Sequence, residues 1–103
     1  MNNKVLNMLG MARRAGRLSF GHDAVKDALR NGEAETVIFA CDASDRLKDE
    51  LTALADINSV TAVVTGFGSS EFGKSTGMKS IAVISVNDAG FAKRIIELTT
   101  QEE

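Results

Sequence analysis

The 103-residue chain contains no proline, tryptophan or tyrosine, and only one cysteine and one histidine. Because a lone Cys41 cannot form an internal disulfide, the sequence favours a reducing compartment such as the cytoplasm. Without proline, the turns must depend on Gly, Asn, Asp and Ser. No long apolar run and no apolar signal core occur, so we expect a protein that is neither membrane-spanning nor exported.

The scarcity of reactive side chains also limits catalysis. His22 and Cys41 fall at a predicted helix start and a predicted strand end, an arrangement that does not favour a nucleophile–base pair, and Cys41 is predicted to be a buried structural residue. No Cys–His spacing indicates zinc, and the acidic residues of segment 42–50 lack the Gly and Glu positions of a calcium loop. We therefore expect no enzymatic activity, no cofactor and no metal.

Charge is low overall but unevenly distributed. The net charge of −2 argues against a protein that coats nucleic acid non-specifically. Residues 1–30, however, hold six Lys and Arg against two Asp, a local charge of +4, whereas residues 31–57 have a local charge of −5. Such a basic patch on an acidic body could dock one RNA site, and a purely solubilising surface is the alternative.

The hydrophobic pattern alternates between helical and strand-like periods. Helices are predicted at 5–15, from Gly21 to Gly32, after a Ser44 cap, and after Asn87 or Asp88, with strands at 18–20, 36–41, 60–64 and 81–86 and one short helical turn around residues 71–72. This order predicts an α/β fold, a three-layer α/β/α sandwich. We expect a single domain over residues 1–100, followed by an acidic tail at 101–103.

One segment imitates a nucleotide-binding motif. Residues Gly68 to Ser75 match the phosphate-loop pattern G-x-x-x-x-G-K-[ST]. A working phosphate loop needs a helix that begins at the lysine, and Gly77 with the strand soon after it leaves no length for one. We interpret the match as coincidental, while nucleotide binding through Lys74 stays a minor alternative.

A basic surface is the better candidate site. Arg13, Arg14 and Arg17 lie close to the turn into Gly21-His22-Asp23, where a helix is predicted to begin with free amides suited to phosphate. Lys26 and Arg30 follow His22 at helical spacing and would extend the surface. The alternative is a solvated face with local ion pairs.

Several motifs in order resemble a known family. Residues 9–16 (LGMARRAG), Gly21 before Val25, residues 28–32 (ALRNG), residues 72–77 (FGKSTG), residues 81–86 (IAVISV) and residues 88–92 (DAGFA) resemble the YlxQ-type bacterial members of the kink-turn-binding ribosomal-protein superfamily. The resemblance covers residues 6–96 and implies a mixed four-stranded sheet, a ribosome- or RNA-metabolism-associated role, no enzymatic activity and no cofactor.

The resemblance also implies an RNA surface. The superfamily motif Gly-x-Asn-Glu-x-x-Lys aligns so that Gly21 is kept, while Asp23, Ala24 and Asp27 stand at the Asn, Glu and Lys positions and Lys26 lies one residue earlier. An ionised Asp cannot donate a hydrogen bond, so kink-turn recognition would depart from its usual form. A second contact region would fall at Ser85, Val86, Asn87 and Asp88, with Val86 packing on an extruded base.

Taken together, these features favour a protein that binds a structured RNA. Exposed Tyr and Trp are absent and the five Phe residues occupy core-type positions, which disfavours a single-strand reader that stacks bases. Arg13, Arg14, Arg17 and Lys26 would hold phosphates, and Gly21, His22 and Asp23 would lie near the bases. Lys74 is a further candidate RNA contact. A protein-interaction module that uses the acidic third helix is the alternative of a different class.

Overall fold

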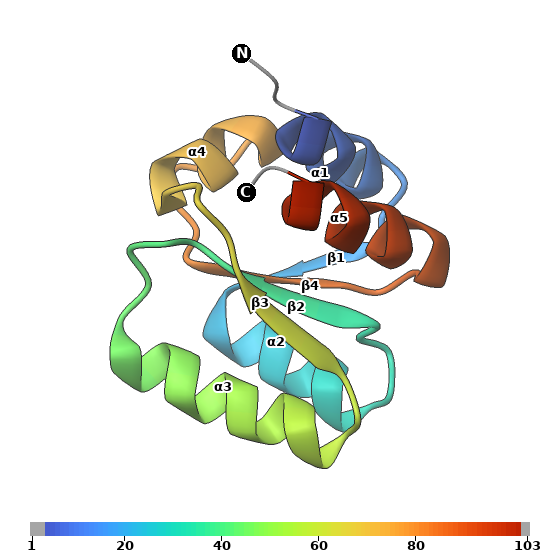
Figure 1. Cartoon of the computed structure of the whole chain (residues 1–103), viewed down its shortest axis with the longest axis vertical. Coiled ribbons are helices and arrows are strands. Elements are labelled where there is room, and N and C mark those ends of the chain that lie inside the picture. The colour runs from blue at the N-terminus through green and yellow to red at the C-terminus, as the bar shows by residue number, and fades with distance from the viewer. Residues whose placement is uncertain (1–3, 102–103) are drawn as a thin grey trace.

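The structure is a computed structural model that describes residues 4–101. It contains, in chain order, α1 (Lys4–Arg14), β1 (Leu18–Phe20), α2 (Gly21–Arg30), β2 (Thr36–Phe39), α3 (Asp45–Ile57), β3 (Thr61–Val64), α4 (Ser69–Thr76), β4 (Val83–Val86) and α5 (Ala89–Gln101). The strands form one sheet in the order β1-β4-β2-β3, in which only β2 and β3 run parallel. The sheet is thus mixed and four-stranded, as the resemblance implied (Figure 1).

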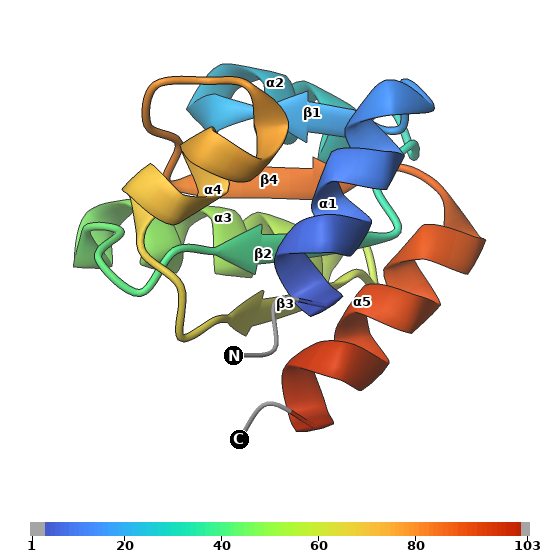
Figure 2. The ribbon, with the colours of Figure 1, turned by 90° about the horizontal axis from the view of Figure 1, so that it is seen from above.

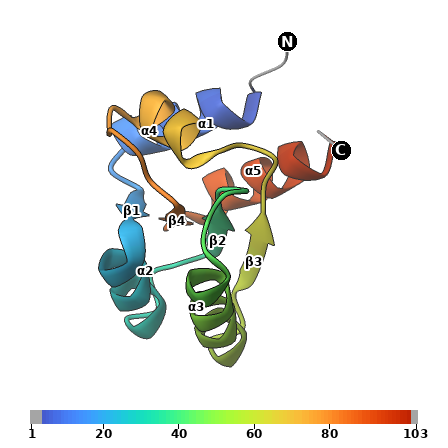
Figure 3. The same ribbon diagram turned by 90° about the vertical axis from the view of Figure 1, so that its left-hand side faces the viewer.

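Helices cover both faces of this sheet. Figure 3 shows α1, α4 and α5 on one side and α2 with α3 on the other. The alternation of strand side chains explains the arrangement, because Ile38 packs with α1 and α5 while its neighbours Val37 and Phe39 pack with α2 and α3. All three are fully buried. The predicted three-layer sandwich is confirmed.

Local signals fix the helix boundaries. The Ser44 hydroxyl accepts a hydrogen bond from the Leu47 amide at 3.1 Å, which caps α3 as predicted. The Asp88 carboxylate accepts one from the Phe91 amide at 2.9 Å and caps α5. Among residues 4–101, no helix combines the length and apolar character needed to cross a bilayer.

Two expectations near the ends of strands were wrong. β2 ends at Phe39, and Cys41 lies in the following turn with an exposed side chain, so it is not a buried structural cysteine. The reason is that the chain turns away from the sheet after β2, and the Cys41 amide donates a hydrogen bond at 2.8 Å to the carbonyl of Phe67, in the segment between β3 and α4. β4 likewise begins at Val83 and not at residue 81.

The segment before β4 is more helical than expected. In place of one short turn, residues 69–76 form the eight-residue helix α4. At the other end of the chain, α5 continues to Gln101, while residues 102–103 of the expected acidic tail lie outside the described part of the chain.

Candidate nucleic-acid interface

The two arginines at the end of α1 lie exposed beside the end of α4. Arg13 and Arg14 form the last turn of α1. The guanidinium of Arg13 packs on Gly77, since a Cβ built on Gly77 would stand 3.8 Å from its Cζ and 3.9 Å from its Nη2. Gly77 ends α4 with a left-handed backbone, φ 76°, a conformation that favours glycine. Arg13 therefore connects α1 to the loop that follows α4. The two helices lie side by side (Figure 2).

The loop between α4 and β4, residues 77–82, is held tightly against α4. The Met78 amide donates to the Gly73 carbonyl at 2.8 Å, and the Ile81 amide donates to the Ser69 carbonyl at 3.0 Å. Met78, Lys79 and Ser80 are exposed. The sequence analysis placed no contact in this loop, although an isolated lysine between a helix-ending glycine and a buried strand could have pointed to it.

This loop also approaches the start of α2. A Cβ on Gly21, which has φ 87°, would lie 3.9 Å from Cδ1 of Ile81. The residue before the helix is Phe20, which provides no side-chain cap, so the first amides of α2 have no capping side chain. The end of α1, the α4–β4 loop and the start of α2 therefore form one continuous strip, which we call the loop face: Arg13, Arg14, Gly21 and residues 77–81.

Charge around Arg13, Arg14 and Arg17 is not cancelled. Within residues 4–101, none of these three guanidinium groups has a carboxylate within ion-pair distance, and the same holds for Lys74 and Lys79. Asp23 is the acidic residue at the start of α2, and its side chain is 98% exposed. The loop face is therefore basic along α1 and the loop, with one carboxylate at its far end.

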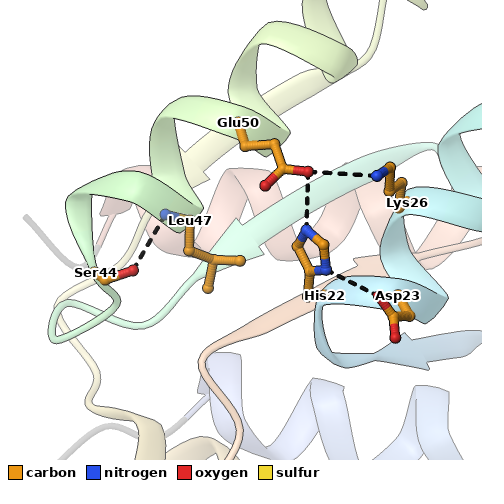
Figure 4. A network of polar contacts seen from close by, with 6 residues as sticks. All are labelled: His22, Asp23, Lys26, Ser44, Leu47 and Glu50. Atoms are coloured by element: carbon orange, nitrogen blue, oxygen red, sulfur yellow. Dashed lines mark hydrogen bonds and ion pairs between the residues drawn. The ribbon is translucent and has the colours of Figure 1, made fainter.

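His22 and Lys26 of α2 point toward Glu50 of α3 (Figure 4). His22 Nε2 lies 2.9 Å from Glu50 Oε2, and Lys26 Nζ lies 3.6 Å from the same oxygen. The other ring nitrogen, His22 Nδ1, lies 2.9 Å from Asp23 Oδ1. Only a protonated imidazole can donate from both nitrogens. Lys26, predicted to hold phosphate, and His22, predicted to lie near the bases, thus both form a link between α2 and α3 in this structure.

These contacts shift the pKa values of two side chains, His22 and Glu50. Hydrogen bonds to Glu50 and then to Asp23 raise the pKa of His22. The hydrogen bond from His22 in turn holds the pKa of Glu50 below its ordinary value, and Lys26 adds to that effect. Glu50 on the acidic third helix is accordingly engaged within the chain.

Arg17 and the predicted second contact region lie at the opposite end of β1. The register pairs Leu18 with Val86, whereas Phe20 pairs with Ile84 near the start of β4. Arg17 consequently lies roughly 13 Å from Gly21, four residues of extended chain away. It borders a hollow of about 560 Å³ that Glu33 and Glu35 also line.

The end of β4 and Asn87 after it take part in contacts between strands. Ser85 and Val86 are fully buried, which leaves no exposed Val86 side chain for the predicted contact with an extruded base. The Ser85 hydroxyl donates to Asn87 Oδ1, and Asn87 Nδ2 donates to the Ser19 hydroxyl, each at 2.9 Å. From the sequence alone, polar residues that hydrogen-bond one strand to another cannot be distinguished from polar residues of a loop that contacts RNA.

Residues Gly68 to Ser75, which match the phosphate-loop pattern, do not form a phosphate loop. Residues 69–76 are helical, and Lys74 lies in the last turn of α4 instead of opening a helix. The amides that a phosphate would need are occupied, since Asp42 accepts hydrogen bonds from the Ser69 amide at 2.9 Å and from its hydroxyl at 3.0 Å. The Gly68 amide donates to Glu71 at 2.8 Å. The hydrogen bonds from Ser69 also lower the pKa of Asp42.

Known proteins share this fold and sequence pattern. RNA-binding protein YlxQ of Bacillus subtilis (strain 168) is 31% identical over 91 residues, which span 88% of this chain and 90% of that protein. RNA-binding protein YlxQ of Enterococcus faecium is 33% identical over 95 residues, spanning 92% of this chain and 90% of that protein.

Solved structures agree. A protein of unknown function from Bacillus halodurans C superimposes with a TM-score of 0.91 at 31% identity, covering 96% of this chain and 99% of that one. The Giardia lamblia 15.5kD RNA binding protein superimposes with a TM-score of 0.76 at 19% identity, covering 98% and 92% of the two chains, and shares the fold. The model of the ribosomal protein L7Ae/L30e/S12e/Gadd45 family matches residues 3–96, and the chain belongs to this family, of YlxQ type, as its motifs indicated.

Proposed function

We propose that this chain binds RNA, and that it recognises a folded RNA through the loop face. Family membership and the two RNA-binding relatives support the first part of the proposal. The observation that carries the second is the position of Arg13, whose guanidinium packs on Gly77 with no carboxylate to neutralise it among the described residues. One short strip thus combines cations with the uncapped start of a helix.

The chemistry of the loop face suits phosphate and shape recognition. Guanidinium groups bind phosphate in two-pronged geometry, and the uncapped amides at the start of α2 add partial positive charge. Asp23 would contact RNA bases differently from the Asn that the superfamily motif has at this position, because an ionised carboxylate accepts hydrogen bonds but donates none. We therefore propose a structured RNA, kink-turn-like in its sharp bend, whose backbone supplies most of the contacts.

The cellular setting follows from the same proposal. An exposed free thiol at Cys41 persists most readily in a reducing compartment, which supports the cytoplasm. A ribosomal or other ribonucleoprotein RNA is the partner class that the family supports.

The test is a titration of the full chain with a kink-turn RNA, a straight duplex and a single strand. We expect the folded RNA to bind tightest, and an Arg13→Glu/Arg14→Glu variant to lose affinity for it. Lys93→Glu/Arg94→Glu on α5 is the matched control, because it makes the same charge change at two adjacent exposed residues. Equal losses in the two variants would show a general charge effect and would refute the proposed surface.

A further inference from the structure

A groove runs between α1 and α4, beside the loop face. The two helices pack closely at Gly10, where an added Cβ would stand 3.1 Å from the Ser75 carbonyl oxygen. Two hollows of about 290 Å³ and about 360 Å³ adjoin along this crossing and share Leu6, Asn7 and Ser75 as walls. The remaining walls are Gly10, Met11 and Arg14 from α1 and Glu71 and Lys74 from α4.

The side chains of this groove combine three kinds of chemistry. Met11 is 48% exposed and, with Leu6, gives the groove an apolar floor. The exposed Asn7 amide can both donate and accept hydrogen bonds. Arg14 and Lys74 supply positive charge and form no ion pair within residues 4–101.

The carboxylate of Glu71 also borders the groove, but it is hydrogen-bonded at the start of its own helix. Glu71 Oε1 accepts the Gly68 amide hydrogen bond at 2.8 Å, at the start of α4. That contact places the carboxylate against the positive end of the helix dipole. The groove therefore keeps a net positive lining from Arg14 and Lys74.

We infer that the α1–α4 groove binds one unpaired nucleotide that flanks the folded part of the RNA. This inference rests on the proposed function and extends it to a second subsite. An apolar floor suits a base, an amide suits its edge, and the two cations suit the phosphates on either side. The occupant is RNA because the lining is positive, and because Met11 and the half-buried Leu6 do not make the wide apolar stripe that a docking helix requires.

Continuity with the loop face supports the same occupant. Arg13 packs on Gly77 in the loop face, while the next residue, Arg14, lines the groove. Consecutive cations at the end of one helix thus serve two neighbouring surfaces. An RNA strand that contacts Arg13 on the loop face would meet the groove at the next residue, Arg14.

The test compares two forms of each folded RNA, one with blunt ends and one with a short oligouridine overhang. The unmodified chain should bind the overhang form on the order of fivefold more tightly, the lower end of the range for a base stacked on an aromatic ring, because Met11 offers apolar contact without a ring. Met11→Ala and Asn7→Ala should each reduce that preference while leaving blunt RNA binding unchanged. Ile57→Ala is the matched control, because Ile57 is apolar and 78% exposed on the opposite layer.

The outcomes separate this inference from the proposed function. If the unmodified chain binds blunt RNA and gains nothing from the overhang, the groove is not a nucleotide subsite, although the proposed function stands. If Met11→Ala weakens both RNA forms equally, the inference fails in the same way. If neither RNA form binds at low salt, the proposed function fails and this inference fails with it.

Discussion

Gly73, inside α4, is the residue whose replacement should perturb the loop face most from a distance. A Cβ at this position would stand 2.5 Å from the Lys79 carbonyl oxygen, 2.7 Å from the Lys79 carbonyl carbon and 2.9 Å from the Ser80 nitrogen. All three are backbone atoms, so no side-chain rotation can relieve the overlap. Gly73→Ala must therefore displace the α4–β4 loop or push α4 outward.

Two effects of opposite sign set the magnitude. Alanine is favoured over glycine within a helix by about 1 kcal/mol. Overpacking a filled site costs about 1–3 kcal/mol, and three backbone overlaps place Gly73 at the upper end. The cost of overpacking exceeds the gain in helix propensity, and we expect a net loss of about 2 kcal/mol in the free energy of unfolding. For a domain of this size, that corresponds to a fall of about 8–16 °C in Tm.

Urea and thermal unfolding would measure this loss, and titration with the folded RNA would measure its effect on the loop face. Gly66→Ala is the matched control, since a Cβ there meets nothing within 4 Å. We expect the control to be neutral or slightly stabilising, because it restricts the unfolded chain. Equal stability and equal RNA affinity of Gly73→Ala and the control would refute the claim that the loop is clamped at this point.

Further outcomes follow from other contacts. Ser44→Ala should lower the free energy of unfolding by about 1 kcal/mol in urea, since it removes the α3 cap, whereas Ser44→Asn should retain most of it. The raised pKa of His22 makes its contribution to stability complete below pH 6.5, the ordinary value, and lost as pH rises through the raised pKa, so His22→Gln should remove that decline from Tm profiles. Calorimetric titration of the unmodified chain with ATP and Mg²⁺ should show no binding, because the residues that match the phosphate-loop pattern form the helix α4 and not a loop. Saturable binding that Lys74→Ala abolishes would contradict this interpretation.

Features that depend on local pattern could be predicted from the sequence. The layers could be predicted from the apolar pattern. The continuous apolar run at residues 37–39 indicates a strand covered on both faces, and all three residues are buried. Ser44 was recognised as a cap because the physics of capping is local. The family followed from motifs spread along the chain, because their order is visible without coordinates.

Features that depend on how distant segments meet could not be predicted. Lys26 and Glu50 are far apart in sequence, and only packing of α2 on α3 brings them together, so Lys26 was assigned to phosphate. The burial of Val86 depends on α1 and α5 covering that face of the sheet. Conversely, the loop after Gly77 has no periodicity, and its place beside Gly21 exists only in the folded chain.

The salt dependence of RNA binding tests the loop face most directly. Each phosphate held by a cation contributes about −0.7 to −0.9 to the slope of log affinity against log salt. Arg13→Ala/Arg14→Ala should therefore make the slope shallower by about 1.4–1.8, while Lys93→Ala/Arg94→Ala on α5 should leave it unchanged. A slope that is the same in the unmodified chain and in both variants would contradict the account.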